Sequence, residues 1–294
     1  MPTLAPAPPM AAAVSAELDL AVSQGPLRSL VIPPCPALLV RMQAVLDQPE
    51  PDLAEVARIA SCDVAMSAAL LRSANSALYG NGIPVHTVGQ AMNRLGLAQT
   101  AAEMTSYLVR RAIPVNSPHL KRFWERGSKR ALAMGYLARR LPGVSPDVAH
   151  TCGLFSHVGM PVMLQSLKGY SGTLVEANAR LDRPFIGTEN ANHRTDHAVV
   201  GALVARVWNL GPTVMSAIRR HHDLDTVGER GTDTDVHNLV AALHVAEHLV
   251  RLNEGLEADS DWTRYGARSL DWLDASQDDL ADWDHDLRDL FDID

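Results

Sequence analysis

Apolar residues recur at spacings of three and four along most of this 294-residue chain. Leu38, Leu39, Met42, Val45 and Leu46 are one example, and this spacing places them on one face of a helix. The strict apolar–polar alternation that is typical of half-buried strands does not occur. The sequence therefore predicts an all-α fold, a multi-helix bundle, and disfavours the parallel-sheet nucleotide-binding folds.

Prolines and glycines divide this periodic pattern into segments. We expect helices near residues 38–46, 53–59, 64–78, 88–95, 98–112, 120–141, 146–167, 173–181, 193–208, 212–222 and 236–253. The prolines in residues 114–118 predict a boundary between two helical lobes, residues 27–115 and 116–250. The Pro/Ala-rich residues 1–26 are expected to form a flexible leader.

The negative charge of the chain is concentrated in residues 251–294. The net charge is −8, and these residues carry 14 acidic and 4 basic side chains, so the rest of the chain is nearly neutral. The same segment holds an apolar stripe at helical spacing, formed by Leu280, Trp283, Leu287, Leu290 and Phe291. We expect an acidic, amphipathic C-terminal extension that docks on the chain's own body or in a partner's groove. Trp283, Leu287 and Phe291 are its candidate partner contacts.

The three cysteines, Cys35, Cys62 and Cys152, are widely spaced and form no CxxC motif. They predict neither a zinc knuckle nor a disulfide framework, and they favour a cytoplasmic location. No basic segment precedes the apolar residues 11–14, and no apolar run reaches about 18 residues, so we expect neither a signal peptide nor a membrane span. The acidic net charge and the scattered arginines argue against nucleic-acid binding.

Three segments carry more specific patterns. The first is VIPPCP at residues 31–36, followed by an amphipathic helix. The second is DVAMSAALLRSANSALY at residues 63–79. The third begins with WNLGP at residues 208–212 and ends with IRRHH at residues 218–222.

These patterns resemble the HDOD domain, the HD-related output domain of bacterial signalling proteins, over about residues 27–250. The matching residues include Asp63, Asn75, Ser76, Tyr79 and Trp208. The resemblance implies an all-helical fold whose C-terminal lobe is related to HD phosphohydrolases. It also implies a regulatory role, with links to motility, biofilm or cyclic-dinucleotide signalling.

HD phosphohydrolases bind their metal ions through histidines and aspartates on neighbouring helices. In this sequence the corresponding positions fall on Arg126, Ser156, His157 and Glu247. An arginine at a metal position repels a divalent cation. The resemblance therefore predicts a degenerate site with no catalytic residue, no metal and no cofactor.

Several histidines remain as weak metal candidates. His197, His221 and His222 match the additional metal-site histidines of the HD-GYP branch, and His193 lies four residues before His197. Imidazoles at these positions could form a low-affinity transition-metal site. They could equally be helix histidines that hydrogen-bond across the bundle, and on that interpretation no metal is expected.

Two rival motifs point to other functions. His244, Glu247 and His248 form an H-x-x-E-H sequence, the inverted-zincin pattern of some metalloproteases. The basic pairs at residues 139–140 and 219–220 could grip an anionic ligand such as a cyclic dinucleotide.

We predict a non-catalytic regulatory module that acts through protein–protein contact. Its expected partners are other signalling proteins, and homodimer formation is left open. A metal-dependent phosphohydrolase with a rebuilt site and a nucleotide-binding sensor without turnover are the alternatives. The phosphohydrolase alternative predicts that the purified protein retains metal in stoichiometric amount. The sensor alternative predicts that the ligand stabilises the folded protein.

Overall fold

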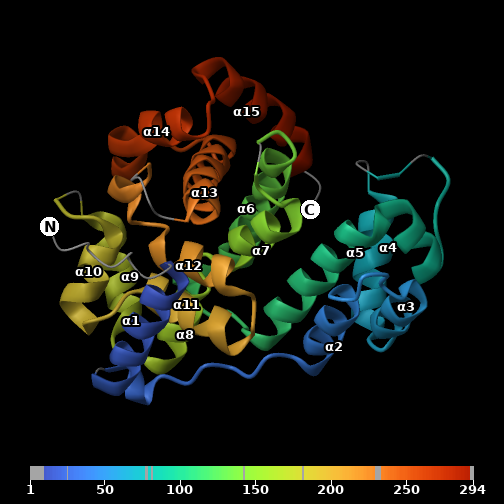
Figure 1. Ribbon diagram of the computed structural model, residues 1–294, viewed down its shortest axis with the longest axis horizontal. Helices are drawn as coiled ribbons and strands as arrows, with labels where there is room; N and C mark the ends of the chain where they lie inside the picture. Colours follow the sequence, from blue (N-terminus) through green and yellow to red (C-terminus); the bar gives the residue numbers. More distant parts are fainter. Residues whose placement is uncertain are drawn as a thin grey trace, which may run out of the picture. The chain divides into compact units, whose positions relative to one another are not determined.

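The computed structural model describes residues 10–24, 26–76, 79–80, 82–141, 143–180, 182–228 and 233–291. These residues form α-helices and short 3-10 turns with no strand among them (Figure 1), which confirms the all-α prediction. Within the same residues, no helix combines the length and the apolar character needed to cross a membrane. The chain divides into two compact units, Met1–Ile32 with Ser117–Asp284, and Pro33–Asn116 with His285–Asp294.

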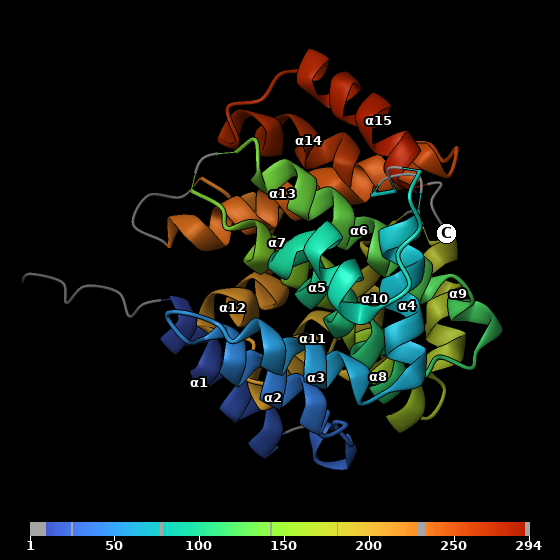
Figure 2. The same ribbon diagram turned by 90° about the vertical axis from the view of Figure 1, so that its right-hand side faces the viewer.

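The first unit is built around one buried helix, α13. The helices of this unit are α1 (Met10–Gln24), α6 (Phe123–Ala138), α7 (Pro146–Phe155), α8 (Gly159–Ser166), α9 (Tyr170–Ala179), α10 (Phe185–His193), α11 (His197–Val207), α12 (Pro212–Arg220), α13 (Thr234–Asn253) and α14 (Ser260–Trp272). Helices α6, α7, α12 and α14 pack against α13, and Figure 2 shows α14 on one side of it and α6 and α7 on the other. Because α13 is apolar almost all round, it is buried rather than amphipathic.

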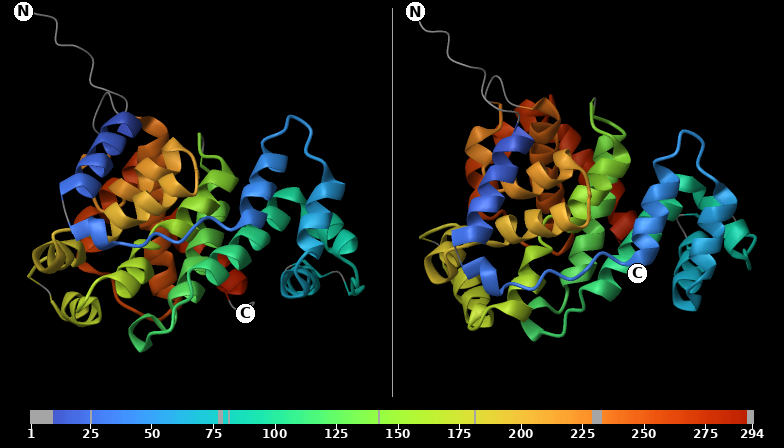
Figure 3. Two further views of the ribbon diagram at one scale, coloured as in Figure 1. Left: turned by 90° about the horizontal axis from the view of Figure 1, so that it is seen from below. Right: turned by 60° about the horizontal axis from the view of Figure 1, so that its bottom comes forward.

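The second unit gathers three helices around a long fourth one. Helices α2 (Ala37–Leu46), α3 (Leu53–Ser61) and α4 (Val64–Asn75) all pack against α5 (Val88–Ala112), as Figure 3 shows in blue to teal. The sequence predicted a break in α5 at Gly96, and Gly96 has φ 77° there, a left-handed conformation that glycine adopts without steric cost.

Residues 10–24 were predicted to belong to a flexible leader, but they form helix α1. Val14 and Leu18 are fully buried on its inner face. Its outer face is held by ion pairs, from Asp19 to Arg206 at 2.7 Å and from Glu17 to Arg219. Figure 3 shows α1, in dark blue, beside α11 and α12. The prolines that suggested flexibility precede the helix, and residues 1–9 lie outside the described part of the chain.

The predicted helix over residues 146–167 is two helices, α7 and α8, joined by a turn of residues 156–158. The interruption allows α8 to cross α11 at very short range. A Cβ atom added to Gly159 would lie 2.1 Å from the carbonyl oxygen of His197. This crossing therefore requires glycine, and it fixes the turn beside the start of α11.

The C-terminal extension contains α14 and a further helix, α15 (Gln277–Phe291), which begins in the first unit and ends in the second. Four residues of the predicted stripe, Leu280, Trp283, Leu287 and Phe291, are buried, and Leu290 is half-buried. The extension is thus helical and amphipathic in the described residues. Whether a partner contacts Trp283, Leu287 and Phe291 stays a prediction, and their burial leaves them little surface to offer.

Candidate functional site

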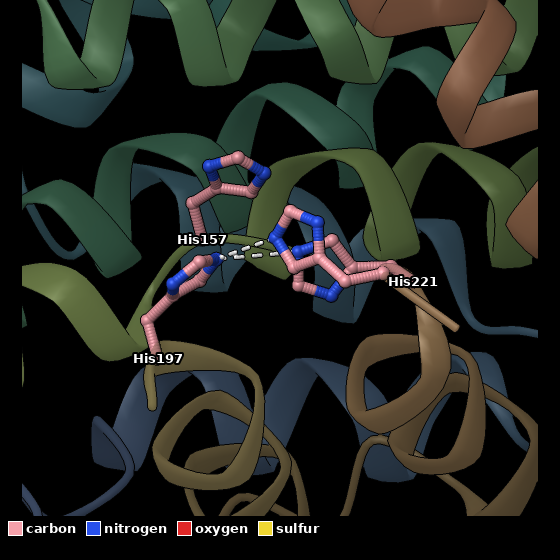
Figure 4. Close-up of side chains that lie close together, drawn as sticks. His157, His197 and His221 are labelled. Atoms are coloured by element: carbon pink, nitrogen blue, oxygen red, sulfur yellow. Dashed lines mark hydrogen bonds between the residues drawn. The ribbon is translucent and has the colours of Figure 1, made fainter. Parts of the chain in front are cut away.

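Four histidine side chains of the first unit converge at one point. His157 lies in the turn between α7 and α8, His197 is the first residue of α11, and His221 and His222 follow α12 directly. One ring nitrogen from each histidine lies within 4.8 Å of those of the other three. Figure 4 shows the rings of His157, His197 and His221 facing one another from three separate segments. We call these four residues the histidine cluster.

The shortest contacts inside the cluster join nitrogen to nitrogen. His197 Nε2 lies 3.3 Å from His221 Nε2 and 3.1 Å from His222 Nε2, as the dashed lines in Figure 4 indicate. The ring centroid of His157 lies 4.9 Å from that of His197 and 5.0 Å from that of His221. His197 and His221 are almost completely buried.

Two members of the cluster have their other ring nitrogen held by a fixed acceptor. His197 Nδ1 donates to Glu189 Oε2 at 2.7 Å, and His221 Nδ1 donates to the carbonyl oxygen of Ile218 at 2.6 Å. Glu189 is fully buried on α10 and also accepts from the Tyr170 hydroxyl. These bonds place the ring protons on Nδ1, so both Nε2 lone pairs point into the cluster.

The remaining two histidines have carboxylates beside their outer nitrogens. His157 Nε2 lies 2.5 Å from Glu247 Oε1, and His222 Nδ1 lies 3.8 Å from Asp261 Oδ2. Burial lowers the pKa of His157 to about 3, so this ring is neutral at physiological pH. Burial also lowers the pKa of His222, but Asp261 and Glu247 outweigh it and hold that pKa above its usual value.

A buried arginine lies next to this cluster. Arg130 Nε donates to Ser156 Oγ at 3.2 Å, and it lies 4.0 Å from Glu247 Oε1. Burial lowers the pKa of Arg130, yet a guanidinium keeps its charge at neutral pH. Burial alone would raise the pKa of Glu247, but His157 and Arg130 outweigh it and the pKa lies below the ordinary range.

Arg126, the predicted position of the first HD ligand, pairs with a residue outside the predicted set. Arg126 is half-exposed and forms a two-pronged ion pair with Glu254, at 2.9 and 2.6 Å. Arg130, four residues later on α6, is the residue that meets Ser156 and Glu247. Residues four apart share a helix face, so Arg126 and Arg130 lie on the same side of α6.

His193 does not join the histidine cluster. It ends α10 and contacts Thr173 Oγ1 at 2.8 Å, whereas His197 begins α11. The predicted single helix over residues 193–208 is interrupted because Arg194 adopts a left-handed φ of 55° and Asp196 caps a new helix. The two histidines therefore do not lie one above the other.

The H-x-x-E-H motif is not assembled into a zinc site. His244 Nδ1 is hydrogen-bonded to Ser269 Oγ at 2.9 Å, and His248 stacks on Trp262 with ring centroids 3.9 Å apart. Glu247 turns the other way, towards His157. The three motif residues thus serve different parts of the first unit, which removes the geometric basis for a metalloprotease.

The basic pair Arg219 and Arg220 is already neutralised within the chain. Arg219 pairs with Glu17 of α1, and Arg220 Nη1 lies 2.8 Å from Asp223 Oδ2. These partners reduce the positive charge available to an anionic ligand, and binding of a nucleotide stays a prediction.

The residues shared with the HDOD pattern have structural roles. Asp63 caps α4 by accepting from the backbone N–H groups of Ala65 and Met66. The Asn75 amide exchanges two hydrogen bonds with the backbone of Val85, at 2.8 and 2.9 Å. The Ser76 hydroxyl donates to the carbonyl oxygen of Ser73. Both polar side chains at the end of α4 are thus bonded to backbone groups.

The aromatic residues of the same pattern differ in burial. Trp208 is almost fully buried and meets Phe155 edge-on, with ring centroids 5.6 Å apart. Tyr79 is half-buried after the end of α4. Trp208 therefore contributes to the core of the first unit, close to the segments that carry the histidine cluster.

A sequence profile of the HDOD domain matches residues 32–224. The chain belongs to the HDOD family. Solved structures with a similar fold include an HDOD domain protein of unknown function from Geobacter sulfurreducens, with a TM-score of 0.71 and 22% identity, covering 95% of this chain and 98% of that one. A candidate phosphohydrolase from Shewanella amazonensis has a TM-score of 0.70 and 22% identity, with 95% and 94% of the two chains covered. These HDOD-type and phosphohydrolase-type neighbours confirm the HD-like fold.

A sequence relative in Treponema pallidum, described only as an uncharacterized protein, is 26% identical over 229 residues. The match covers 76% of this chain and 43% of the relative, so the chain spans less than half of the length of that protein. A candidate signal transduction protein from Marinobacter aquaeolei is similar in fold, with a TM-score of 0.73, 18% identity, and 96% and 64% of the two chains covered.

Sequence reasoning missed Arg130, Glu189 and Asp261, which surround the cluster. No motif marks them, because each acts through a contact between distant segments. Glu189 lies on α10, where the only buried residues are the polar Thr188 and Glu189, so the helix shows little apolar periodicity. Helix α10 was not predicted for the same reason.

Proposed function

We propose that this HDOD protein is a non-catalytic regulatory module that acts through contact with other signalling proteins. The observation that carries the proposal is the buried guanidinium of Arg130, which lies between Ser156 and Glu247 at the positions where HD phosphohydrolases have metal ligands. This fixed cation supplies the positive charge that a metal ion supplies in those enzymes. It also repels a divalent ion from the same place.

Two further features support the loss of HD chemistry. Ser156 offers a hydroxyl that is already bonded to Gly153 and Arg130, and it is completely buried. Glu247 is engaged by His157, so its carboxylate is not available to activate a water molecule. A hydrolase needs a metal-bound water whose pKa is lowered towards neutrality, and these residues do not provide it at this position.

The experiment is a hydrolysis assay on the purified full chain with Mn²⁺, Mg²⁺ or Ni²⁺. Cyclic dinucleotides and a chromogenic phosphomonoester are the substrates, and the expected result is no turnover above the protein-free control. Metal-dependent turnover that disappears in His221→Ala would overturn the proposal. Affinity capture from the native cytoplasm, repeated with a surface-charge control variant, then identifies the partner.

The second candidate is a metal-dependent phosphohydrolase with a rebuilt site, which the histidine cluster itself favours. Four imidazoles at one point are a possible metal site even though the HD position is blocked by Arg130. The same hydrolysis assay separates the two candidates, because only the second predicts turnover.

A further inference from the structure

The histidine cluster has a hydrogen-bonding arrangement that suits a bound cation. Each of its four rings has one nitrogen directed at an acceptor outside the cluster, namely the carboxylates of Glu189, Glu247 and Asp261 and a backbone carbonyl. The Nε2 atoms of His197, His221 and His222 face one another, and His157 brings a ring nitrogen within 4.8 Å of the other three residues' ligand atoms. The lone pairs of His197 Nε2 and His221 Nε2 lie 3.3 Å apart and repel unless a proton or a metal cation lies between them.

The charges around the cluster also favour a bound dication. Glu189, Glu247 and Asp261 contribute three negative charges, and Arg130 contributes one positive charge. Histidines that ligate a metal are neutral, so binding displaces any proton from His222; with four neutral imidazoles the local sum is −2, which one divalent ion neutralises. Buried charges are stable only when they are paired in this way.

The distances suit a four-coordinate ion. A zinc ion with Zn–N bonds of about 2.0–2.1 Å sets tetrahedral ligand nitrogens about 3.3 Å apart. The separations from His197 to His221 and His222 are already 3.3 and 3.1 Å. The widest separation in the cluster is 4.8 Å, within reach of small rotations of the side chains.

We propose that His157, His197, His221 and His222 bind one zinc-type transition-metal dication in a closed, four-nitrogen site. An all-imidazole donor set suits Zn²⁺, Co²⁺ and Ni²⁺, whereas Mg²⁺ and Ca²⁺ prefer oxygen ligands. Because all four ligands come from the protein, the site is of the structural type and keeps no position for a reacting water. Such an ion would tie the α7–α8 turn to the ends of α11 and α12.

Metal binding here goes beyond the proposed regulatory function and does not depend on it. It also departs from the sequence-based expectation of no metal, which assumed that the candidate histidines would hydrogen-bond across the bundle. The Nε2 atoms of His197, His221 and His222 instead have one another as nearest partners. The other ring nitrogens face carboxylates or a backbone carbonyl, as is usual for metal-ligating histidines.

The test measures metal content and affinity on the full chain after removal of any histidine tag. Wild-type protein is stripped with a chelator, reloaded with Zn²⁺ or Co²⁺, and analysed by elemental analysis and titration calorimetry. We expect one ion per chain, a visible cobalt spectrum of four-coordinate type, and no binding of Mg²⁺. Less than stoichiometric zinc at saturation, or a six-coordinate cobalt spectrum, would overturn the closed site.

Three variants add specificity. His221→Gln should weaken zinc binding by about 100-fold or more. Asp261→Asn removes the carboxylate that faces His222 and should weaken zinc binding by about tenfold. His193→Gln is the matched control, because His193 lies outside the cluster, and it should bind zinc like the wild type. Equal affinity in His221→Gln and wild type would refute the assignment. Should His221→Gln fail to fold, the wild-type stoichiometry and cobalt spectrum still decide.

The outcomes for metal and for function are distinguishable. Absence of bound metal would refute this site and leave the non-catalytic function standing. Bound metal with phosphoester turnover would refute the non-catalytic function and the closed coordination, and would leave only metal binding at the four histidines standing.

Discussion

The crossing of α8 over α11 provides a quantitative test of the first unit, through the substitution Gly159→Ala. The added Cβ would lie 2.1 Å from the His197 carbonyl oxygen and 2.8 Å from the Gly201 backbone nitrogen, whereas ordinary contacts begin at 3.4 Å. Both obstacles are backbone atoms, so no side-chain rotation relieves the clash. The two helices must separate by about 1.3 Å to restore normal contact.

The expected energy is the difference between two opposing effects. Overpacking a core costs about 1–3 kcal/mol, and more where backbone must move. Alanine gains at most about 1 kcal/mol over glycine from helix propensity. We therefore expect Gly159→Ala to lower the free energy of unfolding by about 1–3 kcal/mol.

Urea unfolding followed by far-ultraviolet circular dichroism measures this loss as a lower midpoint with an unchanged slope. Gly172→Ala in α9 is the matched control, because an added Cβ there meets no atom within 4 Å. The control should raise the free energy of unfolding by up to about 1 kcal/mol. If Gly159→Ala is as stable as the wild type to within about 0.5 kcal/mol, the close crossing and the position it imposes on His197 are wrong.

Three further predictions concern other parts of the chain. Leu18→Ala should cost about 2–3 kcal/mol because Leu18 is fully buried, whereas Leu20→Ala, at a site 55% exposed, should cost less than about 0.5 kcal/mol; equal urea midpoints would contradict the docking of α1. Asp63→Ala removes the cap of α4 and should cost roughly 1–2 kcal/mol in thermal unfolding, while Asp63→Asn, which can still cap, should cost less. Burial lowers the pKa of His248 to about 4, so its stabilising contribution is present above about pH 6.5 and is lost as the pH falls towards 4, by about 3 kcal/mol at most. His248→Phe, which can retain the stacking on Trp262, should flatten stability between pH 6.5 and 4, and an unchanged acid slope would refute this pKa.

The local elements were predictable because their causes lie close together in the sequence. Asp52 and Asp63 cap their helices through N–H groups two and three residues away. Gly96 breaks α5 where the pattern placed a break. The polar residues Asn75 and Ser76 bond to backbone groups three and ten residues away.

Errors in the predicted helices arose where contacts with a distant segment determine the backbone conformation. The break at residues 156–158 separates α7 from α8, and Gly159 is pressed against α11, which begins 38 residues later in the sequence. Helix α1 is ordered by buried apolar side chains and by ion pairs to Arg206 and Arg219. Periodicity within a short window carries no information on such contacts.

The histidine cluster likewise combines features that the sequence predicts with features that only tertiary packing determines. Motif order and helical periodicity along the chain were enough to identify the HDOD family and the all-α fold, because these follow from residue types at short spacing. The convergence of His157 with His197, His221 and His222 follows from the packing of α7, α8, α11 and α12, as does the choice of Arg130 over Arg126 as the cation beside Glu247. A side chain's partners across a helix bundle depend on the crossing of backbones, and that crossing is settled by close packing in three dimensions rather than by any local pattern.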